Sequence, residues 1–345
     1  MRKIGLTGVS EKAPGISVAR SIRVGCPNTH IVAFGEPMQA GMYIDIDASY
    51  VVAPYDIDAI VKIASAKGVK AIIPNMDDDV EAFAESKDIF FEYDINLLIP
   101  DSNIVRIAND KLETYRYASS KSISMPETVR YSEEMDWEPP YFLKGGSRGV
   151  FRVRSREEAF VIAQYLKQMG ERPIAQKNLD GEPYSVAGIA YDGDVVALMI
   201  KKLRIAENGT TIFGVTIYDE DLLSITKDFV LGIGWEGPFE VEFIRDDDYH
   251  LLEMNSRFPS WIDVGVSAGR NLPAMLAEIL FGQELKIESY KYRTGVTFIK
   301  FPIGVHPMCK VNNIKTFSIM KFLNEVGNDE NIYRIFRVPV DEFHR

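Results

Sequence analysis

Residues 240–257 constrain the fold and the chemistry of this chain more than any other segment. They read Glu-Val-Glu-Phe-Ile-Arg-Asp-Asp-Asp-Tyr-His-Leu-Leu-Glu-Met-Asn-Ser-Arg. Polar and apolar residues alternate on both sides of three aspartates, which predicts two strands joined by a tight acidic turn. Residues two apart on a strand share a face. We therefore expect one face to carry Glu240 and Glu242 on the first strand and Glu253, Asn255 and Arg257 on the second.

If these strands pair as a hairpin, Glu242, Glu253 and Asn255 converge on one spot, with Arg257 beside them. Carboxylate and amide oxygens suit Mg²⁺ shared with phosphates, and an arginine beside them suits a transferring phosphoryl group. The alternative interpretation is a solvated hairpin with a polar outer face. His250 lies on the second strand, where a structural role is more plausible than that of a base.

Length and charge restrict the class of protein. The chain has 345 residues, enough for two or three domains, and a net charge of −11, which disfavours nucleic acid and anionic membranes as partners. No run of 18 apolar residues predicts a membrane span, and the first residues lack the apolar core of a signal peptide. Cys26 and Cys309 form no metal or redox motif. These features predict a cytoplasmic protein.

The first hundred residues alternate apolar runs with helical segments, which predicts a doubly wound parallel sheet. The expected helices are 15–24 and 56–66, and the expected strands are 3–8, 31–35, 50–53, 71–74 and 97–100. Ligands of such sheets bind at the carboxyl ends of the strands, where loops 8–15 and 74–79 lie. Asp77 or Asp78 could hold a substrate ammonium group there; a helix N-cap is an equally good interpretation.

The remaining elements follow the same reasoning. We expect continuous helical structure over 102–122 and further helices at 156–169, 221–232 and 271–281. Strands are expected at 141–144, 151–153, 173–177, 184–191, 195–203 and 211–217. We assign no fold to the tail from about residue 285.

Two further segments have the composition of a nucleotide site. Lys144 ends a predicted strand and runs into Gly-Gly-Ser-Arg-Gly, where glycines let backbone N–H groups approach phosphate oxygens; an ordinary glycine turn is the alternative. Residues 175–182 turn from one strand into the next, and free backbone groups there could read an adenine edge. Glu182 could accept hydrogen bonds from ribose hydroxyls. The alternative interpretation is a plain polar turn that binds no ligand.

Together these motifs resemble the ATP-grasp superfamily. FLKGGSRGVFRV (142–153) is similar to its lysine and glycine phosphate loop, especially that of biotin carboxylase and the large subunit of carbamoyl-phosphate synthetase. AQKNLDGEPYSVAG (175–188) is similar to its adenine hinge, and FEVEFIRDDDYHLLEMNSRF (239–258) to its metal hairpin. The resemblance implies an α/β fold: a doubly wound pre-ATP-grasp domain over 1–108 and a two-subdomain α+β ATP-grasp domain over 109–285. The subdomains would divide at 123–176 and 177–285, with an accessory segment over 286–345.

The resemblance also implies a role for each matching residue. ATP and one or two Mg²⁺ ions, with Mn²⁺ as a substitute, would be the cofactors. Metal ligands would be Glu242, Glu253 and Asn255, and Arg257 would stabilise an acyl phosphate. The phosphates would be held by Lys111, Lys144, Gly145, Gly146, Ser147, Arg148 and Gly149. The adenine pocket would be lined by Gln176, Lys177 and Leu179, with backbone groups of residues 177 and 179 doing the reading. Glu182 would contact the ribose, and Arg204 would contact a phosphate or a carboxylate.

The implied activity is that of an ATP-dependent carboxylate–amine ligase acting on small molecules or peptides, with a homodimer as the usual assembly. The Phe-Pro-Ser-Trp that follows Arg257 and the absence of a biotinyl-carrier sequence favour a small amino-acid or peptide ligase. Three alternatives are bicarbonate or carbamate activation, a non-catalytic ATP-binding module, and a nucleotide-dependent oxidoreductase, the last disfavoured by the missing glycine fingerprint. Trp261, Asp263 and Arg270 could contact the substrate. Core packing of the tryptophan and surface ion pairs of the two charged residues are equally good interpretations.

Overall fold

The computed structural model describes residues 1–10, 13–36, 45–145, 149–206, 209–283 and 291–300. The chain divides into two compact units, Met1–Phe301 and Pro302–Arg345, and every described residue belongs to the first. Cys309 and most of the predicted accessory segment lie outside the described residues. Among the helices of the described ranges, none is long and apolar enough to cross a membrane.

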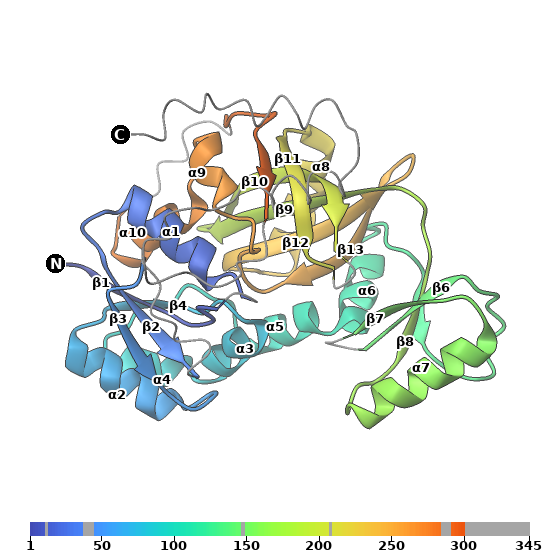
Figure 1. Ribbon diagram of the computed structural model, residues 1–345, viewed down its shortest axis with the longest axis horizontal. Helices are drawn as coiled ribbons and strands as arrows, with labels where there is room; N and C mark the ends of the chain where they lie inside the picture. Colours follow the sequence, from blue (N-terminus) through green and yellow to red (C-terminus); the bar gives the residue numbers. More distant parts are fainter. Residues whose placement is uncertain (11–12, 37–44, 146–148, 207–208, 284–290, 301–345) are drawn as a thin grey trace, which may run out of the picture. The chain divides into compact units, whose positions relative to one another are not determined.

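The N-terminal part of the chain forms the predicted parallel sheet (Figure 1). Its strand order is β3-β2-β1-β4, and every neighbouring pair runs parallel. The strands are β1 (Lys3–Leu6), β2 (His30–Gly35), β3 (Ala48–Val51) and β4 (Ala71–Ile73). The helices that follow are α1 (Gly15–Gly25), α2 (Ile57–Lys67), α3 (Asp77–Glu85), α4 (Lys87–Glu92) and α5 (Ser102–Asn109).

Both faces of this sheet are buried, because alternate strand residues enter two different cores. Ile4 and Ile31 pack in the core that contains α1, whereas Val32 and Ile72 pack in the core that contains α2 and α3. A sheet covered on both faces is what near-continuous apolar strands predict, so the doubly wound arrangement is confirmed.

Polar side chains set the helix ends. Asp56 accepts from the Ala59 N–H at 3.0 Å and begins α2, and Gly68 ends that helix with a left-handed φ of 71°. The helical segment predicted over 102–122 is interrupted at Asp110, whose carboxylate accepts from two N–H groups of α6 (Lys111–Ser120). The prediction of continuous helix across Lys111 was therefore wrong, and the break places Lys111 at the first position of a new helix.

The predicted strand at 97–100 was also wrong. Only Asn96 forms a bridge, with Ala71, and the chain then runs on as a loop. The Leu98 carbonyl lies so close to Gly237 that a Cβ there would meet it at 2.1 Å. The apolar run thus packs against the first residue of the strand β12 (Gly237–Arg245).

A small antiparallel sheet with the order β5-β8-β6-β7 follows, and α7 packs on it (Figure 1). The elements are β5 (Thr128–Arg130), β6 (Tyr141–Lys144), β7 (Val150–Val153), α7 (Arg156–Gln168) and β8 (Ile174–Lys177). Ser155 caps α7 by accepting from the Glu158 N–H at 3.1 Å. Because β6 is an inner strand, Lys144 at its end is held in a fixed place.

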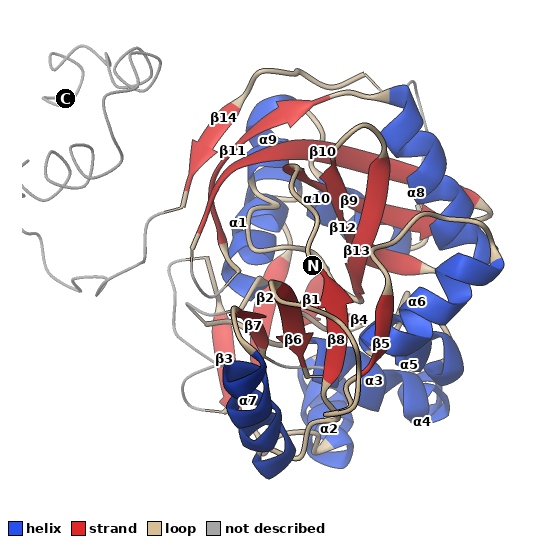
Figure 2. Cartoon of the chain, turned by 90° about the vertical axis from the view of Figure 1, so that its right-hand side faces the viewer, coloured by secondary structure: helices blue, strands red, loops and turns tan. Residues whose placement is uncertain are grey.

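The largest sheet has six antiparallel strands in the order β13-β12-β9-β10-β11-β14, drawn in red in Figure 2. Its strands are β9 (Glu182–Tyr191), β10 (Asp194–Ile205), β11 (Thr211–Ile217), β12 (Gly237–Arg245), β13 (Tyr249–Asn255) and β14 (Thr297–Ile299). The associated helices are α8 (Glu220–Gly232), α9 (Val264–Ala268) and α10 (Leu272–Leu280).

The two faces of this sheet also enter different cores. Val186 and Val241 pack with Phe229 of α8, whereas Ile189 and Leu198 pack with the α9 and α10 side. By the two-residue period of a strand, Ser185, Lys202, Glu240 and Glu242 belong to the second face. The polar site described next is therefore a continuation of an apolar core surface.

Candidate active site

Strands β12 and β13 pair as the predicted hairpin, with a register shift between Glu242 and Phe243. Glu242 pairs with Glu253, and Glu240 pairs with Asn255, on neighbouring positions of the same face. The turn between the strands is the aspartate run, where Asp248 N–H donates to Asp246 at 3.2 Å. This register places two carboxylates opposite each other on the face that carries the site.

Two lysines from other elements reach these carboxylates. Lys202 of β10 places its Nζ 2.6 Å from Glu242 Oε1, and Lys111 of α6 places its Nζ 3.4 Å from Glu253 Oε2. The Lys202 side chain is only 2% exposed. Lys111 was predicted to belong here, but Lys202 was not. The strand residue that had been predicted, Arg204, is exposed at a register shift between β10 and β11.

A third lysine, Lys144, is buried at the end of β6. Burial lowers the pKa of its ammonium group, and nearby Lys111 lowers it further, while Glu253 and Glu242 act in the opposite direction. Burial also works against ionisation of Glu253, but Lys111, Lys144 and Lys202 outweigh it and lower its pKa to about 2. Glu253 is thus a fully ionised carboxylate among three ammonium groups.

Glu242 has a different electrostatic environment. Burial raises the pKa of its carboxyl group; Lys202 counteracts this only in part, and Glu240 and Glu253 raise it further. A divalent cation against two or more oxygens would relieve this repulsion. The charge balance at the hairpin is therefore of the kind that a metal ion stabilises.

Glu240, which the sequence placed on the correct face but gave no role, is a buried acceptor for four side chains. Its Oε1 accepts from Ser185 Oγ at 2.7 Å and from Trp261 Nε1 at 3.1 Å. Its Oε2 accepts from Asn255 Nδ2 at 3.0 Å and from Arg257 Nη1 at 3.4 Å. Glu240 therefore positions two of the predicted site residues.

Arg257 is held from a second side by the N-terminal part of the chain. Its Nε lies 3.4 Å from Asp77 Oδ2, and the other oxygen of Asp77 accepts from both the N–H and the hydroxyl of Ser256 at 3.1 Å. Asp77 is in the first turn of α3, with Met76 as the N-cap residue. Its partners are Arg257 and Ser256, so the interpretation of Asp77 as the N-cap was wrong.

The phosphate loop is described only at its two ends. Gly145 N–H donates to the Gly149 carbonyl at 3.0 Å, which closes the loop, and Gly149 has a φ of 82° that favours glycine. Gly146, Ser147 and Arg148, which were predicted to contact phosphate, lie outside the described residues.

The predicted adenine hinge is only partly arranged for recognition. Gln176 is buried and donates to Thr128 at 3.0 Å, so its side chain belongs to the small sheet. The Lys177 N–H donates to the Glu127 carbonyl at 2.9 Å. This N–H therefore already has a backbone acceptor. Leu179 is half-buried, and Glu182 is exposed and paired with Lys201.

The structure gives the surroundings of the residues whose contact with substrate the sequence left undecided. Trp261 is buried and donates to Glu240 at 3.1 Å. Arg270 is buried and donates to the Ala197 carbonyl at 3.2 Å, so it stabilises the core. Asp263 is half-buried, and burial raises the pKa of its carboxyl group against the effect of Arg20. His250 Nε2 donates to Asp246 Oδ1 at 2.9 Å, and its Nδ1 lies 2.7 Å from Ser124 Oγ.

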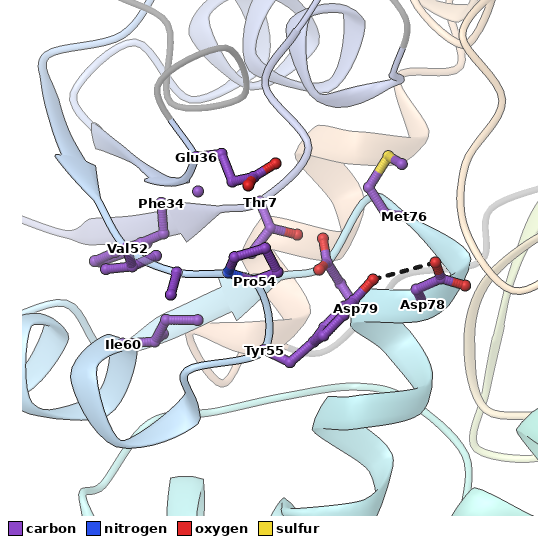
Figure 3. Close-up of a pocket in the computed structure, with 12 residues that line it drawn as sticks. Thr7, Phe34, Glu36, Val52, Pro54, Tyr55, Ile60, Met76, Asp78 and Asp79 are labelled. Carbon is purple, nitrogen blue, oxygen red and sulfur yellow. Dashed lines mark hydrogen bonds between the residues drawn. The ribbon is translucent and has the colours of Figure 1, made fainter.

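A pocket lies at the carboxyl ends of the parallel strands (Figure 3). Its walls combine Phe34 and Met76 with Asp78 and Asp79, and the Tyr55 hydroxyl donates to Asp78 at 3.2 Å. Burial raises the pKa of Asp79 to about 6, with a hydrogen bond from Thr7 acting against it. The cavity has a volume of about 80 Å³.

Among the residues that the structure describes, no three or more His, Cys, Asp and Glu side chains form a group that could hold a metal. The predicted metal set has two carboxylates and one amide. Asn255 is the amide of this set. The carboxylate of Glu240 can only accept a hydrogen bond, so the amide nitrogen of Asn255 must face Glu240. Its Oδ1 must then point away from Glu240. The donor set of Glu242, Glu253 and Asn255 Oδ1 fits a hard divalent cation.

The fold and this site define a class: an α/β protein in which lysines from other elements surround paired carboxylates on a hairpin. Residues 108–260 match the ATP-grasp domain family. The chain thus carries an ATP-grasp domain over these residues, where the motifs indicated one.

Solved structures share the fold at low sequence identity. Pyruvate carboxylase from Rhizobium etli has a TM-score of 0.66 at 18% identity over 83% of this chain, which spans only 28% of that one. A biotin carboxylase complex with β-γ-ATP from Campylobacter jejuni has a TM-score of 0.67 at 16% identity, covering 82% of this chain and 72% of that chain. L-amino acid ligase from Bacillus licheniformis has a TM-score of 0.66 at 14% identity, covering 84% and 77%. No curated protein matches the sequence.

Proposed function

We propose that the protein is an ATP-dependent carboxylate–amine ligase that forms an amide through an acyl phosphate and releases ADP and phosphate. The observation that carries the proposal is the pairing of Glu242 with Glu253 across the hairpin, with Lys111, Lys144 and Lys202 around them. Anionic oxygens for a metal and ammonium groups for phosphates are what phosphoryl transfer from ATP needs in one place.

The chain's own groups divide this work. Lys111 and Lys144 neutralise the phosphates, and we expect the glycine-rich segment that follows Lys144 to add backbone N–H groups. Arg257, held by Asp77 and Glu240, faces the charge that develops on the transferring group. Mg²⁺ on Glu242, Glu253 and Asn255 would supply Lewis-acid polarisation of the phosphates.

In the first step the substrate carboxylate attacks the γ-phosphorus of ATP, and the bond to the β-phosphate oxygen breaks to give an acyl phosphate and ADP. In the second step an amine attacks the acyl carbon, phosphate leaves with the bonding electrons, and the amine loses a proton. The chemistry requires positioning and charge neutralisation but no covalent nucleophile from the protein. This agrees with a sequence that offers no evident Ser-His-Asp or Cys-His set.

Recognition of the base and the acid is assigned to two places. We expect the adenine to lie at the hinge near Leu179, read by the Lys177 carbonyl and backbone groups of residue 179, with Glu182 near the ribose. We expect part of the acid or amine substrate in the pocket of Figure 3, because ligands of open α/β sheets bind at the carboxyl ends of the strands. Domain limits of 1–108, 109–285 and 286–345, a homodimer and a cytoplasmic location remain predictions.

Two of the structurally similar proteins have names that imply different acid substrates. The Bacillus licheniformis protein is named for amino-acid ligation, whereas the Campylobacter jejuni protein is named for biotin carboxylation. Bicarbonate activation is therefore the second candidate, and it shares the metal and phosphate sites. The third candidate, a binding module without turnover, is disfavoured because the sequence of the hairpin keeps Glu242, Glu253, Asn255 and Arg257.

The test is ADP and phosphate release from Mg·ATP in the presence of pooled amino acids, short peptides or bicarbonate, with products identified by mass. ADP release that depends on an acid and an amine, with an amide product, supports the ligase. Release that depends on bicarbonate alone supports the second candidate. Tight ATP binding with no turnover in any pool contradicts the proposed activity and favours the binding module.

A further inference from the structure

A second pocket lies on the small antiparallel sheet, beside α7. It is formed by the loop that follows β5, the start of β6 and the first turns of α7, and it has a volume of about 140 Å³. Its walls include the aromatic rings of Tyr131, Trp137, Tyr141 and Phe160. The pocket is therefore mainly an aromatic one.

The alternation of β6 separates this pocket from the phosphate site. Tyr141 and Leu143 belong to the core under α7, and residues two apart on a strand share a face. Lys144, at the other end of the strand, belongs to the opposite face, where its Nζ lies 6.0 Å from the centroid of the Phe142 ring. The pocket is thus distinct from the candidate active site.

The rings of the pocket are held in place by the surrounding structure. The Tyr131 N–H donates to the Pro173 carbonyl at 3.0 Å. Trp137 and Tyr141 pack edge to face, with ring centroids 6.1 Å apart and planes at 80°. Tyr141 is buried, whereas Phe160 is 45% exposed. The pocket therefore offers a preformed aromatic surface that solvent can reach.

The charge in this pocket is negative and unbalanced. The charged residues that line it are Glu133 and Arg156. Arg156 is paired with Glu138 at 2.6 Å, whereas Glu133 makes no ion pair with any residue that the structure describes. Burial raises the pKa of the Tyr131 hydroxyl and the charge of Glu133 raises it further, so this carboxylate acts on the aromatic wall. Because the faces of aromatic rings are also negative, the pocket complements a cation.

The protein already places an ammonium group on one of these rings. Lys177 Nζ lies 5.2 Å from the centroid of Trp137 and 2.7 Å from Glu127. Lys177 does not line the pocket, so its ammonium group leaves the pocket side open. An ammonium between a carboxylate and Trp137 is the arrangement that Glu133 and the rings of the pocket offer to a ligand.

We propose that this pocket is a binding site for a small organic ammonium cation, whose charge faces Glu133 and whose carbon groups contact the aromatic rings. Alkylated ammonium groups suit such a site, because they combine a positive charge with an apolar surface that can lie on ring faces. The inference is independent of the proposed function, since none of the lining residues belongs to the candidate active site.

The experiment uses the full chain and tetramethylammonium chloride as the probe, at an ionic strength held constant with sodium chloride. Saturation transfer from the protein to the methyl protons of the probe detects binding by NMR, and a titration gives the Kd. The comparison compound is tert-butanol, which has a similar shape and no charge. We expect a Kd of about 1–10 mM for the probe and binding at least about tenfold weaker for tert-butanol.

Two pairs of variants separate the pocket from the general surface. Glu133→Gln removes the carboxylate that lines the pocket, and Glu134→Gln removes the exposed carboxylate next to it. Phe160→Leu removes an exposed ring of α7 that lines the pocket, and Tyr165→Leu removes an exposed ring of the same helix that does not. We expect Glu133→Gln to weaken binding of the probe about threefold and Phe160→Leu about fivefold, with no change in the two controls.

Three results would overturn the proposal. Equal affinity for tetramethylammonium and tert-butanol would show that the pocket does not recognise charge. Equal weakening in a control and in its partner variant would show attraction to the surface in general. Absence of saturation transfer at probe concentrations well above the expected Kd would show that the pocket binds no such cation.

Discussion

Asn255 donates its Nδ2 hydrogen to Glu240 Oε2 at 3.0 Å, directly across the hairpin of β12 and β13. The bond fixes the amide so that its oxygen points away from Glu240, on the face that carries Glu242 and Glu253. The same Glu240 carboxylate holds Ser185, Trp261 and Arg257. The part of the site with no proposed role in chemistry thus determines where the proposed metal ligand and arginine lie.

Replacing Glu240 with Gln should therefore destabilise the fold as well as the site. A glutamine side chain presents an amide nitrogen where two donors now find an acceptor, and a buried unpaired donor costs about 1–3 kcal/mol. We expect the free energy of unfolding in urea to fall by about 2–4 kcal/mol. Glu236→Gln, at an exposed position, is the control and should stay within about 0.5 kcal/mol. A loss of unfolding free energy below about 0.5 kcal/mol in Glu240→Gln would show that the hydrogen bonds of Glu240 contribute little to stability.

Glu253→Gln should leave the fold intact and remove Mg²⁺-dependent turnover. The amide has nearly the same shape but lacks the charge that Mg²⁺ and three lysines require. We expect turnover to fall by about 100-fold or more, with an unchanged circular dichroism spectrum. Asp247→Asn in the nearby turn should retain activity. Near-normal turnover in Glu253→Gln would rule out the metal assignment.

Asp77→Asn tests the role of Arg257 independently of the other site residues. The amide oxygen of the new side chain would still accept from Ser256, but the charge opposite Arg257 would be lost. If Arg257 stabilises the transition state, kcat should fall by about tenfold to 100-fold while the KM for ATP changes little. Asp58→Asn, an exposed carboxylate in α2, serves for comparison. A rise in the ATP KM at constant kcat would place Arg257 in ATP binding instead.

The carboxyl group of Asp79 should make stability depend on pH. Its folded pKa of about 6 lies above the ordinary value of 3.8, so the folded state holds the proton more tightly. Its contribution to stability is then lost as pH rises from about 4 to about 6. Asp79→Asn, which cannot ionise, should exceed the parent chain in unfolding free energy by about 3 kcal/mol at pH 8 and equal it at about pH 3.5. Urea unfolding at both values tests this, and a difference independent of pH would contradict it.

The hairpin could be predicted from sequence because its information is local. Alternation over 240–257 sets both strands, the aspartates set the turn, and a two-residue period sets the face of Glu242, Glu253 and Asn255. The parallel sheet was equally accessible, because apolar runs such as that of β2 are typical of strands that are buried on both faces.

Lys202 and the break at Asp110 could not be found in the same way. The run Lys-Lys-Leu-Arg at 201–204 offers three basic residues, and only the register of β10 against its neighbours decides which one faces the site. Asp110 can continue a helix or begin one, and tertiary packing selects the second. The role of Asp77 depends on contact with Ser256 and Arg257, which lie far along the chain, and no local pattern encodes that contact.

The central claim is tested most directly by following oxygen. An acid that supports ADP release is labelled with ¹⁸O in its carboxylate, and the phosphate formed with the amide product is examined by mass spectrometry. Since the carboxylate attacks the γ-phosphorus and its oxygen stays with phosphate when the amine arrives, each phosphate should carry one ¹⁸O. Unlabelled phosphate alongside an amide product would contradict the acyl-phosphate ligase.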